Sequence, residues 1–91
     1  MRRQVKALVD TRDNGDLYVQ APAVGLYGFA PRVGEVLVGR SRLGRLTTLG
    51  VTVDLVLPAG VTGRVAKRVA VTRHDPVEYG QSLLLSLIHI S

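Results

Sequence analysis

Residues 51–57, Val51-Thr52-Val53-Asp54-Leu55-Val56-Leu57, place an apolar side chain at every second position. Successive side chains of a β-strand point to opposite faces, so this period of two is typical of a strand with one face in a core. Gly50 marks a turn before the stretch, and Pro58-Ala59-Gly60 closes it. The stretch therefore predicts a strand of a layered, all-β domain.

The rest of the chain shows the same kind of pattern and no window of helical periodicity. Asn14-Gly15 tolerates positive φ at both residues, so it predicts a tight hairpin near the N-terminus. Gly and Pro interrupt the chain too often for long helices. Further strands are predicted at 4–10, 17–21, 26–29, 36–38, 43–49, 61–71, 77–80 and 83–88.

Composition limits the class of protein. The 91 residues fit a single domain, 1–91, and include 15 Val and 13 Leu against one Phe and no Trp. Because Val favours strands, this composition agrees with the pattern. The absence of Cys excludes disulfides, thiolate catalysis and cysteine-based zinc sites. No apolar run reaches the roughly 20 residues of a membrane span, and no apolar signal core opens the chain, so we expect a cytoplasmic protein.

The charge leaves several kinds of partner open. The net charge is +5, and Arg supplies ten of the twelve cations. Such a balance suits nucleic acid, a phosphate-bearing ligand or an acidic protein, and it also follows from a GC-rich genome. The run Arg40–Arg45 is the densest basic segment; it either binds an anion or guards a strand edge with charge. With aromatic residues at only 4% there is little material for base stacking, so nucleic acid is not the expected partner.

The chain also repeats itself. At an offset of 41 residues, six of the fifteen positions from 32 to 46 are identical to their counterparts, Gly39 with Gly80 and Leu43 with Leu84 among them. Upstream, Gly25 matches Gly63 at an offset of 38. Two repeats are too few for a solenoid. They predict two halves related by a pseudo-twofold axis.

Four segments resemble conserved stretches of one family. Ala21–Gly25 is similar to an S/A-P-M-x-G strand, and Val33–Gly39 to a V-x-x-G-D-x-V-x-x-G segment. Pro58–Val65 resembles A-x-x-x-G-x-V, and Asp75–Leu83 resembles Q-P-V-E-F-G-Q-x-L. In this order, over about residues 17–87, they resemble the biotinyl/lipoyl attachment domains, the biotin carboxyl carriers in particular. The resemblance implies a barrel-sandwich hybrid fold, with an additional N-terminal hairpin strand.

The resemblance also shows a departure from the family. There an A/E-M-K-M motif places a lysine at an exposed hairpin turn, where a ligase attaches biotin or lipoate. Counting back from Gly63 without gaps puts Thr52 at the lysine position, flanked by Gly50, Val51 and Val53. Threonine has no amine to acylate, and the two lysines, Lys6 and Lys67, lie in other predicted strands. We therefore expect a chain that carries neither cofactor.

Other candidate sites are weak. His74-Asp75 precedes Pro76 in a predicted loop, and a catalytic triad needs partners that adjacency does not supply. His74 and His89 are a poor metal set, and Asp10, Asp13 and Asp16 lack the order of a calcium loop, so we expect no metal site. Residues 88–91 exceed the family's pattern, and Ser86–Ile90 resembles translated adapter sequence, in which case residues 88–91 carry no function.

The resemblance implies a function without chemistry. The chain would be a non-catalytic, lysine-less carrier-like domain, a structural or docking subunit of a biotin-dependent acyl-CoA carboxylase system, with carboxylase subunits as its partners and no membrane. Two alternatives remain open from the sequence. One is a lipoyl-like domain of a membrane-fusion or efflux adaptor, and the other is a small basic β-barrel that binds RNA.

Overall fold

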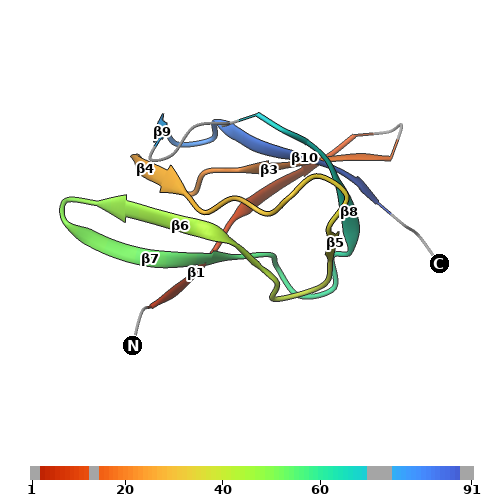
Figure 1. Ribbon diagram of the computed structural model, residues 1–91, viewed down its shortest axis with the longest axis horizontal. Coiled ribbons are helices and arrows are strands. Elements are labelled where there is room, and N and C mark those ends of the chain that lie inside the picture. Colours follow the sequence, from red (N-terminus) through yellow and green to blue (C-terminus); the bar gives the residue numbers. More distant parts are fainter. Residues whose placement is uncertain (1–2, 13–14, 70–74, 89–91) are drawn as a thin grey trace.

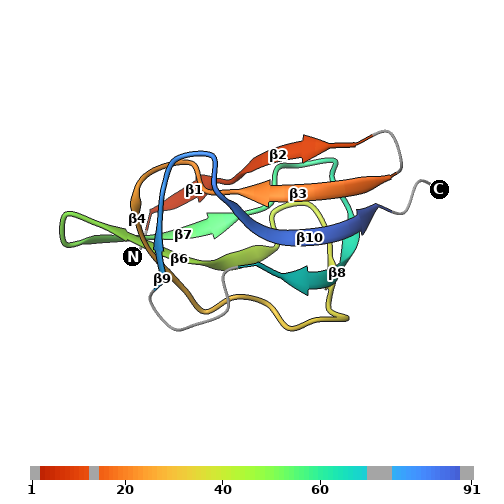
Figure 2. The same cartoon turned by 90° about the horizontal axis from the view of Figure 1, so that it is seen from above.

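The computed structural model describes residues 3–12, 15–69 and 75–88, and these form two packed five-stranded β-sheets (Figures 1 and 2). Sheet A has the order β1 (Gln4–Lys6), β7 (Val51–Val56), β6 (Arg42–Thr48), β4 (Gly25–Gly28) and β9 (Asp75–Val77). Sheet B has the order β2 (Leu8–Thr11), β3 (Asp16–Gln20), β10 (Ser82–Ile88), β8 (Gly63–Arg68) and β5 (Val36–Leu37). The predicted all-β barrel-sandwich architecture is confirmed.

The two sheets are built alike, as a pseudo-twofold axis requires. Strands β7-β6-β4-β9 of sheet A correspond in order to β3-β10-β8-β5 of sheet B. The short strands β5 and β9 are exchanged between the halves: β5 follows β4 in the chain but pairs with β8, while β9 follows β8 but pairs with β4. This exchange interlocks the halves and makes the domain one folding unit.

The register of the repeat differs by one residue from the sequence alignment. Gly25 pairs with Val77 and Gly63 pairs with Leu37, so Leu37 and Val77 are equivalent, an offset of 77 − 37 = 40. The turns agree, because Arg40 and Gly80 both have positive φ, at 70° and 80°. The predicted offset of 41 is therefore wrong. It aligned Gly39 with Gly80, whereas the structure places Arg40 there.

The N-terminal strand serves both sheets. The predicted strand 4–10 is broken at Ala7, which is buried and donates its backbone N–H to the Val56 carbonyl at 3.0 Å. Before Ala7 the chain pairs in parallel with β7, and after it the chain pairs antiparallel with β3. The antiparallel pairing of β2 with β3 confirms the predicted N-terminal hairpin, while Asn14 of its predicted turn lies outside the described residues. One side of the sandwich is thereby closed by a single segment.

The core lies between the sheets and is almost entirely aliphatic. Tyr27 supplies its aromatic ring, and its buried hydroxyl donates to the Leu43 carbonyl at 2.5 Å. Burial raises the pKa of this hydroxyl above its usual value, with Arg68 opposing the shift. The core residues are Ala7, Leu17, Val19, Ala21, Tyr27, Leu37, Leu43, Leu46, Leu55, Leu57, Val65, Val77, Leu83 and Leu84.

Candidate functional site

The four segments that carry the resemblance meet in two equivalent junctions. Ala21 accepts a backbone hydrogen bond from Gly80 at 2.8 Å and donates one to Gln81 at 2.9 Å. In the other half, Leu57 accepts from Arg40 and donates to Ser41, both at 2.9 Å. The first and fourth segments are thus joined directly. The second and third are joined beside the other junction, where Gly34 donates to the Val65 carbonyl at 2.7 Å and Val65 donates to that of Glu35 at 2.9 Å. The junctions hold β6 and β10 in place, and β6 leads into the hairpin that the family uses for attachment.

The β6–β7 hairpin projects from one end of the domain (Figure 1). Its turn is Leu49-Gly50, and both residues have positive φ, at 50° and 78°. Such a two-residue turn matches the right-handed twist of the flanking strands. The Leu49 side chain is 99% exposed and that of Val51 is 63% exposed. The tip therefore presents apolar side chains on a rigid turn.

The hairpin is braced against the start of β4. The Thr48 hydroxyl donates to the Val24 carbonyl at 2.6 Å, and Thr47 and Thr52 share a hydrogen bond at 2.9 Å across the strands. Gly25 allows this approach, since a Cβ there would lie 2.5 Å from the Thr47 carbonyl oxygen. These contacts restrict the hairpin to one orientation.

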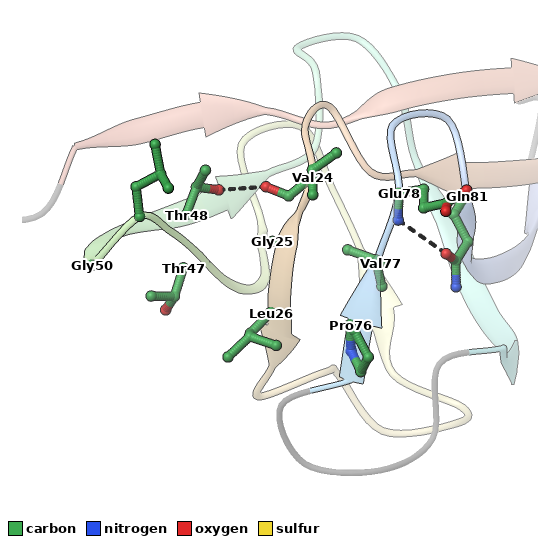
Figure 3. Close-up of a pocket in the computed structure, with 11 residues that line it drawn as sticks. Val24, Gly25, Leu26, Thr47, Thr48, Gly50, Pro76, Val77, Glu78 and Gln81 are labelled. Atoms are coloured by element: carbon green, nitrogen blue, oxygen red, sulfur yellow. Dashed lines mark hydrogen bonds between the residues drawn. The ribbon is translucent and has the colours of Figure 1, made fainter.

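A shallow groove lies between the tip and the edge of sheet A (Figure 3). Its volume is about 730 Å³, and most of its lining is apolar. The Gln81 side chain accepts a hydrogen bond from the Glu78 backbone N–H at 3.0 Å, which fixes the loop on one side. The lining residues are Val24, Gly25, Leu26, Thr47, Thr48, Leu49, Gly50, Pro76, Val77, Glu78 and Gln81. A groove of this kind suits binding.

Thr52 does not lie at the hairpin tip, so that part of the prediction is wrong. It lies within β7 opposite Thr47, and Val53 on the other face packs against the core. The count back from Gly63 without gaps did not take account of the turn that Gly50 favours. A lysine in the exposed turn would instead stand at Leu49 or Gly50. Thr48, Leu49, Gly50 and Val51 contain no amine.

The two lysines of the chain lie away from the turn. Lys6 is on β1 and pairs with Val56, at the opposite end of β7 from the hairpin turn. Lys67 is on β8 of sheet B and pairs with Leu85. Both side chains are exposed. Neither has the position that the family's attachment lysine has.

The basic run contributes to a charged cluster on sheet A. Arg45 Nε lies 3.6 Å and Arg42 Nη2 4.0 Å from the carboxylate of Asp54, which is almost buried. The Arg45 guanidinium also lies 4.7 Å from the ring centroid of Phe29. Arg40 lies in the turn before β6 with a φ of 70°. Two of the three arginines of the run are therefore placed together by β6.

The remaining candidates do not assemble into a site. Asp10 forms an ion pair with Arg12 at 3.1 Å, while Asp13, His74 and residues 89–91 lie outside the described residues. Within the described ranges, no three His, Cys, Asp or Glu side chains are grouped as metal ligands. The same part of the chain contains no helix with the length and hydropathy to cross a membrane.

Comparison with known proteins supports the fold. No family model and no curated protein matches the chain. Among solved structures, the chain is similar to a single-chain, multi-domain long-chain acyl-CoA carboxylase, with a TM-score of 0.69 and 22% identity. The match covers 91% of this chain and 8% of that one. The chain therefore shares its fold with a small part of a multi-domain acyl-CoA carboxylase.

Proposed function

We propose that the chain is a carrier-like domain without an attachment site, which acts as a docking or structural component of an acyl-CoA carboxylase system. One observation carries the proposal: the hairpin that corresponds to the family's attachment hairpin turns at Leu49-Gly50. With Thr48-Leu49-Gly50-Val51 over the A/E-M-K-M motif, Gly50 occupies the lysine position. The apolar residues Leu49 and Val51 flank it, as methionines flank the lysine in the family.

The rest of the domain supports a binding role. The interlocked halves share one core, and the threonine hydroxyls beside the tip are engaged in internal hydrogen bonds. Such engaged hydroxyls are poor nucleophiles without an adjacent base. The domain would act by surface recognition, with protein partners and with no chemistry of its own.

The test is co-elution with defined components. The purified chain is mixed with the biotin carboxylase and carboxyltransferase components of the same cell and analysed by size-exclusion chromatography with light scattering. We expect a stoichiometric complex with at least one component and no change when biotin is omitted from growth. If the chain formed a complex with none of these components, the proposal would be contradicted.

A further inference from the structure

The outer face of sheet A concentrates positive charge along strands β1, β7 and β6. Leu55 is fully buried in the core, so its neighbours Asp54 and Val56 point to the outer face. Lys6 and Arg42 both pair with Val56. Arg45 pairs with Asp54. The described residues of these three strands therefore place three cations on the same face as one carboxylate.

The acids of the chain lie elsewhere. Asp10 and Asp16 belong to β2 and β3 of sheet B, and Glu35 precedes β5 of that sheet. Glu78 follows β9, at the edge of sheet A farthest from β1. Asp75 lies on β9 at the same edge and pairs with Tyr27 of β4. Among the described residues, the acids of sheet A other than Asp54 thus lie at its β9 edge, away from the cationic face (Lys6, Arg42, Arg45 and Asp54).

The geometry of the arginines leaves them available to a second anion. The separations of 3.6 and 4.0 Å from Asp54 exceed the 2.7–2.9 Å of a charge-assisted hydrogen bond. The Arg42 side chain is 60% exposed. The Phe29 ring beneath Arg45 restricts the guanidinium before a partner arrives, which reduces the entropy lost on binding.

Phe29 adds an apolar contact to this face. Its φ is 59°, a conformation that bulky residues rarely adopt, and its side chain is 67% exposed. Core packing does not explain backbone strain at an exposed aromatic residue, and such strain is typical of functional sites. Aromatic and arginine side chains together dominate binding at many interfaces. The arrangement combines an aromatic anchor with a cationic surround.

We propose that this cationic face binds an acidic, Asp/Glu-rich segment of a partner protein. The inference deepens the proposed docking function and rests on it, because it names the surface and the chemistry of the partner. Guanidinium groups such as those of Arg42 and Arg45 have a fork geometry that matches carboxylates. A nucleic acid is the less suitable partner, since a single exposed phenylalanine is a small stacking surface.

The test uses two double variants of equal net charge. Lys6→Gln/Arg42→Gln removes two cations from the proposed face. Lys67→Gln/Arg64→Gln removes one lysine and one arginine from exposed positions of β8 in sheet B. Each variant and the parent are titrated with a fluorescein-labelled oligoglutamate peptide at low ionic strength, where surface charges are least screened. A single-stranded RNA and an oligoglutamine peptide are titrated in parallel.

We expect the sheet A variant to bind oligoglutamate at least about tenfold more weakly than the parent. The sheet B variant should bind oligoglutamate within about threefold of the parent. It loses only the long-range attraction that depends on total charge, and this attraction changes affinity little. Oligoglutamine should not bind. Equal losses in both variants, or RNA binding tighter than oligoglutamate and lost from the same face, would overturn the proposal.

The outcome is separable from the proposed function. A carboxylase complex that the Lys6→Gln/Arg42→Gln variant still forms with unchanged affinity would refute this surface and leave the docking function standing. Oligoglutamate binding through the face, without any carboxylase complex, would refute the docking function instead. Circular dichroism of each variant checks that the sheets are intact.

Discussion

Tyr27 is a titratable side chain that is buried in the hydrophobic core. Its hydroxyl is buried, is bonded to the Leu43 carbonyl, and has a raised pKa because desolvation disfavours the phenolate. When the pKa of an acid is higher in the folded state, the folded state loses stability as the pH rises above the pKa of the unfolded state. For tyrosine that pKa is about 10. The contribution of Tyr27 is therefore constant below that pH and falls above it.

The variant Tyr27→Phe should make this visible. At neutral pH it should lose about 1 kcal/mol, the usual net value of a buried hydrogen bond. Between pH 7 and about 11 it should lose less further stability than the parent, since its ring does not ionise. Urea unfolding of both proteins at the two pH values is the measurement. An identical alkaline loss in both would show that the Tyr27 hydroxyl does not resist ionisation.

Three neighbouring residues of β7 test which face is buried. Thr52→Lys should cost about 0.5–1.5 kcal/mol, because it removes the hydrogen bond to Thr47 on the outer face. Val53→Lys should cost several-fold more, since it turns a charge toward the core. Leu55→Ala should cost roughly 2–5 kcal/mol through the cavity it leaves.

Thermal unfolding of the three variants beside the parent provides the comparison. A Thr52→Lys variant as unstable as Val53→Lys would mean that the strand faces the other way. The period of two in 51–57 could predict which side chains face the core, because successive side chains of a strand point to opposite faces. It could not predict the distance of Thr52 from the turn, which depends on where the backbone adopts positive φ.

At the scale of elements, the hairpin turn is open to improvement. A turn with two residues at positive φ favours Asn-Gly, so Leu49→Asn should stabilise the domain by about 0.5–1 kcal/mol. Gly50→Ala should destabilise it by about 1 kcal/mol, because a positive φ is sterically unfavourable for alanine. Urea denaturation of both variants is the check. A destabilised Leu49→Asn would indicate that Leu49 makes packing contacts in solution that its 99% exposure contradicts.

The sequence predicted most strands but neither the sheet change at Ala7 nor the register of the repeat. A strand that passes from one sheet to another keeps its local pattern, so residues 4–10 resemble one continuous strand. Identity favoured aligning Gly39 with Gly80, whereas the turn geometry pairs Arg40 with Gly80. An arginine at positive φ has no signal in a pattern of residue types, because glycine is the residue expected there.

The clustered charges were also beyond the sequence. Arg42 and Arg45 were visible as a basic run, but Asp54 comes from β7, and Phe29 directly follows β4. Only strand pairing brings them within reach of one another. The sequence left the run open between anion binding and protection of a strand edge. Because β6 is the central strand of sheet A, the expected edge protection is wrong for Arg42 and Arg45, and anion binding stays a proposal.

At the scale of the whole molecule, the fold is shared with a small part of a multi-domain acyl-CoA carboxylase. The proposed function places Gly50 at the attachment position. The interlocked halves and the projecting hairpin are the main features of this fold. In the proposed function, the turn Leu49-Gly50 offers no lysine for attachment. Gly50 is therefore the residue at which to test both proposals, that the β6–β7 hairpin corresponds to the carrier hairpin and that it lacks only the lysine.

The decisive measurement is the intact mass of the parent and of Gly50→Lys after co-expression with biotin ligase. The account predicts an unmodified parent and a biotin-sized increment on the Gly50→Lys variant, whose lysine stands in the exposed turn between Leu49 and Val51. An increment on the parent would show that Lys6 or Lys67 accepts biotin. A folded Gly50→Lys variant without any increment would contradict the claim that this hairpin is the carrier hairpin.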